Sequence, residues 1–221
     1  MDEFGNIKII DNNLFALNSD NNILYHFVDG QLKQTLNKVG RGPGEYFVID
    51  LYDYDPVKGL VYISDRDDRE LLVYDANNNF EHVRTIKINQ SQTLPIMALL
   101  DSDHLMHVAS PNTEGAFASM KILNLQDLSI DSICGFNQNV KLNSTITMDR
   151  CSNKDKLFGI NDHVSYIYRY VQRNGKYCID TLYSVQMGEN YDIPYNIANA
   201  DTRTDDGYWT FYNLSFACKI F

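Results

Sequence analysis

The sequence predicts an all-β fold built from repeated four-stranded units, and three observations support this interpretation. Residues 14–28, 61–75 and 157–171 align without gaps, at offsets of 47 and 143 residues from the first segment. Each segment places short aromatic and β-branched runs between turns rich in Asn and Asp, which is the pattern of antiparallel strands. No helical period longer than two turns is present. Four strands recurring about every 40 to 50 residues are typical of β-propeller blades.

The first unit contains four apolar runs, and we name the strands they predict A to D. A polar segment rich in Asn separates B from C, and Asp29-Gly30, a dipeptide favoured in two-residue hairpins, separates C from D. The predicted strands of this unit cover residues 7–10, 14–17, 23–27 and 31–36.

The second unit repeats this order with more continuous apolar runs. Its B–C turn is the charged segment 65–69, and its C–D turn is the Asn-rich segment 77–79. Asn and Asp favour such turns because they tolerate positive φ and can hydrogen-bond to their own backbone. The predicted strands cover residues 48–54, 61–63, 71–74 and 80–88.

The remaining units are less regular but keep the spacing. In the fourth unit Asn174-Gly175 is a strong hairpin signal between C and D. A fifth, incomplete unit is expected, with its B strand at residues 208–211. The predicted strands cover residues 105–108, 117–124 and 128–134 in the third unit, and 145–150, 157–160, 166–170 and 176–185 in the fourth.

The spacing therefore predicts one propeller domain over residues 1–221, with four blades and part of a fifth. The blades are expected at about 7–36, 47–88, 95–134, 144–185 and, incompletely, 196–221. We expect this to be a piece of a longer protein, because a propeller normally closes its ring and so protects its strand edges. The alternative is a ring of five blades with a reduced last blade. An open arc would expose blade edges and favour self-association.

The composition excludes some classes of partner. The chain has 29 acidic and 19 basic residues, a formal charge of −10 and a pI of about 4.8. This balance argues against binding nucleic-acid backbone or anionic lipid, which both need basic surface. No run of 18 apolar residues indicates a transmembrane helix, and residues 1–5 lack the features of a signal peptide. The sequence leaves the compartment open.

The sequence contains no recognisable metal or cofactor motif. The four cysteines form no CxxC pair and no zinc spacing with histidine, so we expect buried free thiols; they are Cys134, Cys151, Cys178 and Cys218. Neither a G-x-S-x-G elbow nor an H-E-x-x-H motif occurs. We therefore predict no cofactor, no resident metal and no assigned catalytic residue.

One segment between the first two blades stands out as a candidate site. Residues 38–46 read KVGRGPGEY, and three glycines with a proline exclude a strand. This loop joins strand D to strand A, and we expect it on the same face as the charged B–C turn of the second blade. The candidate ligand-binding residues on that face are Arg41, Glu45, Tyr46, Asp65 and Arg66. The alternative is that Arg41 and Glu45 fix the crossing between blades through ion pairs and backbone hydrogen bonds.

His163 is a further candidate on the same face. It lies in the B–C turn of the fourth blade, where an imidazole could serve as a base or a ligand. A single histidine without an assigned partner does not define a catalytic site.

The segment GRGPGEY, followed by IDLYDYD and VYISDRDDRELLVYD, resembles six-bladed β-propeller proteins with NHL-like repeats from Bacteroidales. The resemblance is specific over about residues 7–90 and weaker through 185. It implies a ring of six blades and an exported, periplasmic or cell-surface lipoprotein. It also implies that this chain lacks the export signal and the last one or two blades. The family offers no catalytic residues to transfer.

These observations favour a non-catalytic binding or scaffold propeller, whose loop face near the central channel engages a protein or glycan ligand. The alternative is a propeller-type lyase or hydrolase that uses a metal at the channel mouth or His163. A third possibility is a purely structural or truncated product. The identity of the ligand does not follow from the sequence.

Overall fold

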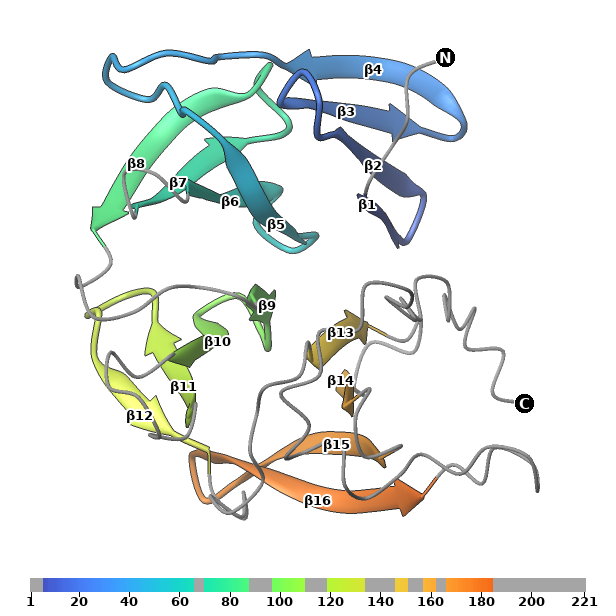
Figure 1. Ribbon diagram of the computed structural model, residues 1–221, viewed down its shortest axis with the longest axis vertical. Helices are drawn as coiled ribbons and strands as arrows, with labels where there is room; N and C mark the ends of the chain where they lie inside the picture. The colour runs from blue at the N-terminus through green and yellow to red at the C-terminus, as the bar shows by residue number, and fades with distance from the viewer. Residues whose placement is uncertain are drawn as a thin grey trace, which may run out of the picture. The chain divides into compact units, whose positions relative to one another are not determined.

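The computed structural model describes residues 6–65, 70–87, 97–109, 119–133, 146–150, 157–161 and 166–184. Within these ranges every regular element is a β-strand, and the strands form four-stranded antiparallel sheets (Figure 1). This confirms the predicted all-β class with four-stranded antiparallel blades. The chain divides into two compact units, Met1–Ser132 and Ile133–Phe221. The prediction of one domain stays a prediction, and the partial fifth blade lies outside the described residues.

The first unit holds three sheets, each made of strands that follow one another along the chain. The first sheet contains β1 (Asn6–Ile10), β2 (Asn13–Asn18), β3 (Ile23–Val28) and β4 (Gln31–Leu36). The second contains β5 (Ile49–Asp55), β6 (Leu60–Asp65), β7 (Glu70–Asp75) and β8 (Glu81–Lys87). The third contains β9 (Met97–Leu99), β10 (His104–Ala109), β11 (Ser119–Asn124) and β12 (Ile130–Ser132).

The hairpin between β3 and β4 has the turn that its sequence predicts. Asp29 and Gly30 both have positive φ, at 50° and 77°, as a type I′ turn requires. This turn follows the right-handed twist of the flanking strands, so the dipeptide fixes the pairing of β3 with β4 locally.

A β-bulge recurs at the same position of three sheets. The pairing of the third strand with the fourth shifts after His26, Val73 and Arg169. Val73 and Arg169 follow His26 by 47 and 143 residues, which are the offsets of the sequence repeat. Since bulges increase local twist, the repeat encodes a distortion of the fourth strand at an equivalent point of each of these three sheets.

The first two sheets bury a common core. Alternation along the strands directs one face of each sheet toward the other, and aromatic side chains fill much of the space between them. The buried side chains of this core are Phe15, Leu17, Leu24, Leu36, Tyr46, Ile49, Tyr52, Tyr54, Val61, Ile63, Leu72, Tyr74, Ala76 and Phe80.

The second sheet is buried on both faces. On β7, Leu72 belongs to the core with the first sheet, while its neighbours Leu71 and Val73 belong to a second core with the third sheet. The second core contains Tyr62, Leu71, Val73, Ile86, Met97, Leu99, Leu105, Leu123 and Leu125. Burial on two sides explains why β6 and β7 read as nearly continuous apolar runs.

Polar contacts join neighbouring sheets at equivalent positions. Gln34 Nε2 on β4 donates to the Ala76 carbonyl oxygen at 2.6 Å, just after β7. Arg84 Nη2 on β8 donates to the Leu125 carbonyl oxygen at 2.7 Å, just after β11. In both cases a side chain on the fourth strand of one sheet donates a hydrogen bond to the backbone carbonyl just after the third strand of the next sheet, where the ladder has ended.

A buried carboxylate links the first strands of the three sheets. Asp53 on β5 lies 3.2 Å from Lys8 Nζ on β1, and its Oδ2 accepts a hydrogen bond from Leu99 N on β9 at 2.7 Å. Both a cation and a backbone donor therefore compensate the burial of this charge.

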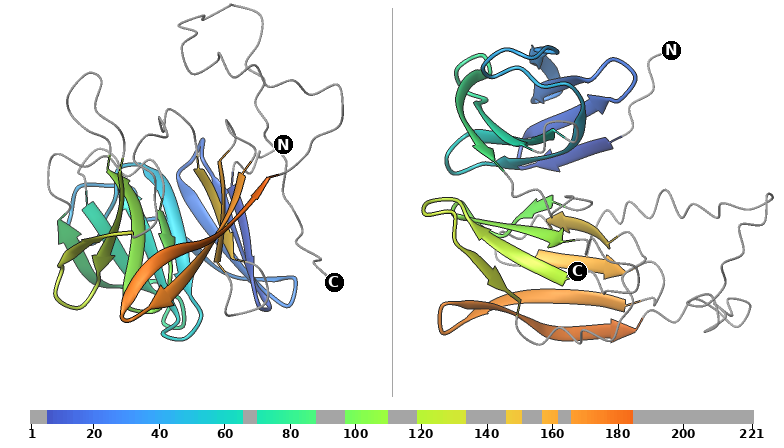
Figure 2. Two further views of the ribbon diagram at one scale, coloured as in Figure 1. Left: turned by 90° about the horizontal axis from the view of Figure 1, so that it is seen from below. Right: turned by 60° about the vertical axis from the view of Figure 1, so that its left-hand side comes forward.

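The second unit contains β13 (Ile146–Arg150), β14 (Leu157–Asn161), β15 (Tyr166–Arg173) and β16 (Lys176–Ser184), paired in chain order. Figure 2 shows the pronounced twist of the β15–β16 hairpin. Asn174 and Gly175 have positive φ, at 51° and 75°, which confirms the predicted hairpin turn. Cys178 on β16 is disulfide-bonded, which corrects the expectation of a free thiol at this position. The other three cysteines lie outside the described residues.

Candidate functional site

The segment between β4 and β5 folds as a compact loop, and we call residues 38–47 the crossing loop. Gly40 N donates to the Tyr46 carbonyl at 2.9 Å, and Tyr46 N donates to the Lys38 carbonyl at 3.1 Å. Glu45 N donates to the Gly42 carbonyl at 3.0 Å, which closes the turn at the tip. The loop thus has a backbone hydrogen-bond network of its own.

The Glu45 carboxylate lies close to two of the glycines in the turn. Its Oε2 accepts a hydrogen bond from Gly42 N at 2.7 Å. A Cβ at Gly40 would lie 2.0 Å from the same oxygen, and one at Gly42 would lie 3.0 Å away. A side chain at either position would therefore require the end of the Glu45 side chain to move. This matches the alternative interpretation, in which Glu45 stabilises the loop backbone.

Gly44 is required for a second reason. Its φ of +72° is a conformation that favours glycine, and an added Cβ would lie 2.5 Å from Cγ of His82 on β8. Its carbonyl accepts a hydrogen bond from the Tyr74 hydroxyl at 3.1 Å. Burial raises the pKa of Tyr74, so this hydroxyl keeps its proton. The tip of the crossing loop is thus packed closely against the second sheet.

Tyr46 anchors the loop from inside the protein. Its side chain is fully buried. Its hydroxyl donates a bifurcated hydrogen bond to the carbonyl oxygens of Asn22, at 2.8 Å, and Leu36, at 3.0 Å. The same oxygen accepts a hydrogen bond from Lys38 N at 3.2 Å. Burial raises the pKa of Tyr46 to about 12. The phenol is therefore a structural donor that does not face solvent.

Asp65 holds the other end of the loop. This buried carboxylate at the end of β6 accepts a hydrogen bond from Phe47 N through Oδ2 at 2.6 Å. Asn22, in the turn between β2 and β3, accepts one from Ile49 N through Oδ1 at 3.3 Å. The crossing loop and the start of β5 therefore contact the turn between β2 and β3 and the end of β6.

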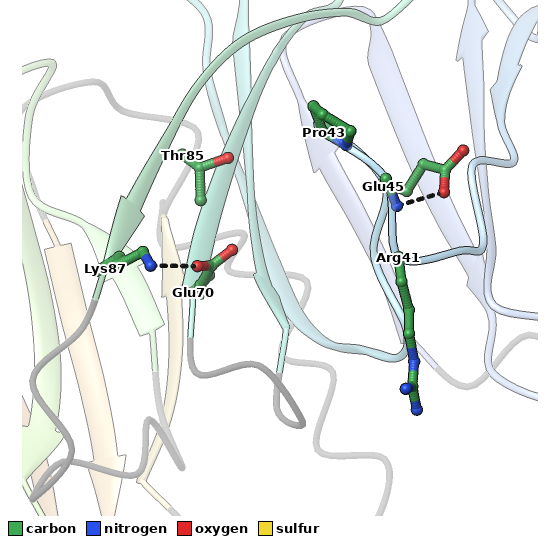
Figure 3. Close-up of a pocket in the computed structure, with 8 residues that line it drawn as sticks. Arg41, Pro43, Glu45, Glu70, Thr85 and Lys87 are labelled. Atoms are coloured by element: carbon green, nitrogen blue, oxygen red, sulfur yellow. Dashed lines mark hydrogen bonds and ion pairs between the residues drawn. The ribbon is translucent and has the colours of Figure 1, made fainter.

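A hollow of about 530 Å³ lies between the crossing loop and the ends of β7 and β8 (Figure 3). Its charged side chains are Arg41, Glu45, Glu70 and Lys87, and Pro43 and Thr85 complete the side-chain wall. Lys87 Nζ lies 3.8 Å from Glu70 Oε1 across the β7–β8 ladder. In Figure 3 the Arg41 side chain extends away from Pro43 and Glu45. The hollow is open and polar.

Arg41 and Phe47 form a pair on the exposed side of the loop. The guanidinium carbon lies 5.2 Å from the centroid of the Phe47 ring, which is within cation–π range. Phe47 is 40% exposed and Val39, on the neighbouring stretch of the loop, is 49% exposed. Buried hydrogen bonds thus hold in place a loop that presents two apolar side chains and a cation to solvent.

The structure separates the six predicted site residues into three groups. Arg41 and Glu45 line the hollow, whereas Tyr46 and Asp65 are buried and bond to the loop backbone. Arg66 and His163 lie outside the described residues. Whether any of the six binds a ligand stays a prediction.

Sequence reasoning missed Phe47, Glu70, Thr85 and Lys87, which surround the same surface. A signal was present for Glu70 and Lys87. Glu70 directly precedes the predicted C strand and Lys87 lies near the end of the predicted D strand, so a hairpin of these strands brings the two opposite charges together. Phe47 falls between the predicted loop, which ends at Tyr46, and the predicted strand, which begins at residue 48, and β5 begins at Ile49.

Among the described residues, no group of three or more His, Cys, Asp or Glu side chains is arranged to hold a metal ion. The same part of the chain has no helix with the length and apolar character needed to span a membrane.

Several solved structures share the fold of this chain at low sequence identity. A Bacteroides fragilis protein described as exported matches with a TM-score of 0.60 and 20% identity, covering 80% of this chain and 50% of that one. A DUF4221 member from Bacteroides vulgatus matches with a TM-score of 0.58 and 10% identity, covering 84% and 59%. The WD40 domain of Toxoplasma gondii coronin matches with a TM-score of 0.53 and 10% identity, covering 83% and 46%.

The chain spans about half the length of these structures. No curated protein matches it. The DUF5128 family, described as a 6-bladed β-propeller, matches residues 1–208, which include all four described sheets. Four-stranded antiparallel sheets that recur in chain order are the blades such a propeller requires. The chain therefore belongs to the DUF5128 family of six-bladed β-propellers.

Proposed function

We propose that this chain is a non-catalytic binding or scaffold module that engages a protein ligand through the crossing loop and the adjoining hollow. The observation that supports this is the contrast within the loop. Tyr46, Asp65 and Glu45 tie its backbone down, while Val39 and Phe47 remain about half exposed. A surface held rigid before binding loses little conformational entropy on association.

The exposed side chains of the crossing loop and the hollow indicate the class of ligand. Aromatic residues and Arg are enriched in the central parts of protein interfaces, and Arg41 with Phe47 supplies both. A glycan is the second candidate, because Thr85, Glu70 and Lys87 give the hollow donors and acceptors for sugar hydroxyls. The two classes can be separated by experiment.

The test exposes the full chain to a displayed random-peptide library and to a glycan array. Each ligand recovered is then measured against Val39→Ser, Phe47→Ser and the control Val57→Ser. Val57 is 83% exposed in the β5–β6 turn, at the opposite end of the second sheet from the crossing loop. We expect the two loop variants to lose binding and the control to retain it. Ligands equally affected by all three variants, or no ligand at all, would contradict the proposal.

This proposal does not include a lyase or hydrolase activity. That alternative depends on His163 or on a metal at the channel mouth, and His163 lies outside the described residues.

We further propose that the protein is an exported member of an NHL-like lipoprotein group of Bacteroidales. Two observations support export. The Bacteroides fragilis structure of similar fold is described as exported, and Cys178 is disulfide-bonded here. Disulfides persist mainly in oxidising compartments. Mass spectrometry after thiol alkylation in intact cells tests this. We expect Cys178 to be protected until a reductant is added, and its complete alkylation without reductant would contradict export.

We also propose that the open face of the first sheet mediates self-association. Ile7 and Ile9 lie on β1 opposite the face that packs on the second sheet, and they are 55% and 66% exposed. In a closed propeller such a face packs against another blade. Sedimentation velocity of the wild type and of the double variant Ile7→Thr with Ile9→Thr tests this. We expect the wild type alone to form larger species with rising concentration. A wild type that stays monomeric would refute it.

A further inference from the structure

A guanidinium stacked on an aromatic ring keeps its hydrogen-bonding edge open. Arg41 lies over Phe47, and it makes no hydrogen bond or ion pair with any residue that the structure describes. The ring supports the flat face of the guanidinium but engages none of its five N–H groups. The fork geometry of these donors matches a carboxylate, which can accept two parallel hydrogen bonds.

The other charges around the hollow are engaged within the protein. The Glu45 carboxylate accepts a hydrogen bond from Gly42 N, and Glu70 lies beside Lys87. Among the described residues that line the hollow, Arg41 is therefore the charged group without a polar partner. An incoming anion would find a cation there without first breaking an ion pair.

The surroundings of Arg41 favour a peptide as the source of that anion. Val39 and Phe47 lie on adjacent stretches of the loop, because Val39 forms a backbone bridge with Tyr46. Both are exposed, so an apolar side chain next to the carboxylate has a surface to cover. The guanidinium already covers one face of the Phe47 ring, which leaves less bare aromatic surface for a sugar ring.

We propose that Arg41, held in place by Phe47, binds an Asp or Glu side chain of a peptide ligand whose neighbouring apolar residue packs on Val39 and Phe47. This rests on the proposed binding function and specifies the partner as an acidic, partly apolar peptide segment. Arg41 supplies the charge selectivity, and the tethered loop supplies the fixed position.

The experiment selects a random-decapeptide display library on the full chain, on Arg41→Glu and on the control Lys33→Glu. Lys33 is an exposed cation on β4, outside the crossing loop, so its reversal changes the net charge equally. We expect the wild type and the control to enrich peptides with Asp or Glu next to an aliphatic or aromatic residue. Arg41→Glu should lose these and enrich Lys or Arg instead.

Synthetic versions of one enriched peptide complete the test. Changing its acidic residue to Gln should weaken binding to the wild type about tenfold to a hundredfold, the usual range for charge-assisted hydrogen bonds. Changing that residue to Lys should restore binding to Arg41→Glu. Far-UV circular dichroism establishes that each variant is folded.

Each other outcome overturns a distinct part of the argument. Enriched peptides without acidic residues, or acidic peptides that bind Arg41→Glu equally well, would refute the role of Arg41 and leave a peptide-binding module. Binding of oligogalacturonate that depends on Arg41, with no peptide enriched, would refute a peptide partner and leave a binding module for acidic glycans. No binding of either probe would refute the inference and the proposed function together.

Discussion

Acidification should destabilise the interface between the first two sheets because His26 is buried there as a neutral ring. The imidazole stacks on Phe15 with ring centroids 4.3 Å apart. Its Nε2 lies 2.8 Å from Asn13 Oδ1, and its Nδ1 lies 3.3 Å from Gln34 Nε2. In the neutral ring Nε2 donates and Nδ1 accepts. A proton on Nδ1 would face the Gln34 amide group, which already donates to the next sheet.

The size of the effect follows from linkage. Burial, with a smaller contribution from the charge of Lys33, lowers the pKa of His26 from 6.5 to about 4. The pKa of His26 is lower in the folded protein than in the unfolded chain. Between pH 6.5 and about 4 the unfolded chain therefore binds more protons, and the free energy of unfolding decreases as the pH is lowered. Lowering the pH from about 7.5 to about 5 should cost about 2 kcal/mol at this residue. Burial likewise lowers the pKa of His107 to about 4, so this histidine adds a similar loss.

Urea denaturation followed by far-UV circular dichroism measures the loss in the wild type, His26→Gln and His107→Gln. Glutamine keeps one donor and one acceptor but cannot take up a proton in this range. We expect the free energy of unfolding of the wild type to fall by about 4 kcal/mol over this pH change, and that of each variant by about half as much. A variant whose pH dependence equals that of the wild type would refute the argument for its histidine.

Three further predictions concern the residues that position the crossing loop and join the sheets. Tyr46→Phe removes a buried hydroxyl from two carbonyls and should lower the free energy of unfolding by about 1–3 kcal/mol in urea denaturation; an unchanged midpoint would contradict its anchoring role. Gly44→Ala should destabilise more than Gly30→Ala by calorimetry, because both glycines have positive φ but only an added Cβ at Gly44 meets another residue; equal losses would contradict the close packing of the loop. Asp53→Asn should cost about 3 kcal/mol or more near neutral pH, because it leaves Lys8 partly buried without its counter-charge; a double variant with Lys8→Met that is as unstable as Asp53→Asn alone would argue against this pairing.

Most of the strands were predictable because the signal for them is local. Alternating and continuous apolar runs between Asn, Asp and Gly turns define β2, β3, β6 and β7 within a residue or two of the observed bounds. The turn at Asn174-Gly175 also follows from two residues alone. The offsets of the repeat then predict where the next sheet begins.

The position of the candidate site was predictable from the sequence, but which of its side chains are buried and which face solvent was not. The glycines and proline of residues 38–47 indicate a loop, yet Arg41, Glu45 and Tyr46 are similar in local context. Their burial differs because the Tyr46 ring belongs to the core shared by the first two sheets, where its hydroxyl donates to the carbonyl groups of Asn22 and Leu36. A disulfide at Cys178 likewise depends on another segment of the chain, and its spacing in the sequence carries no such signal.

An all-β chain of repeated four-stranded blades follows from local sequence, down to the turn residues, because backbone preference and side-chain alternation act between near neighbours. That Asp65 lies inside while Phe47 stays half exposed beneath Arg41 depends on how the loop packs in three dimensions. Burial depends on what packs on a residue, and Asp65 is covered by a loop that comes 18 residues earlier in the chain, a contact that no local pattern specifies.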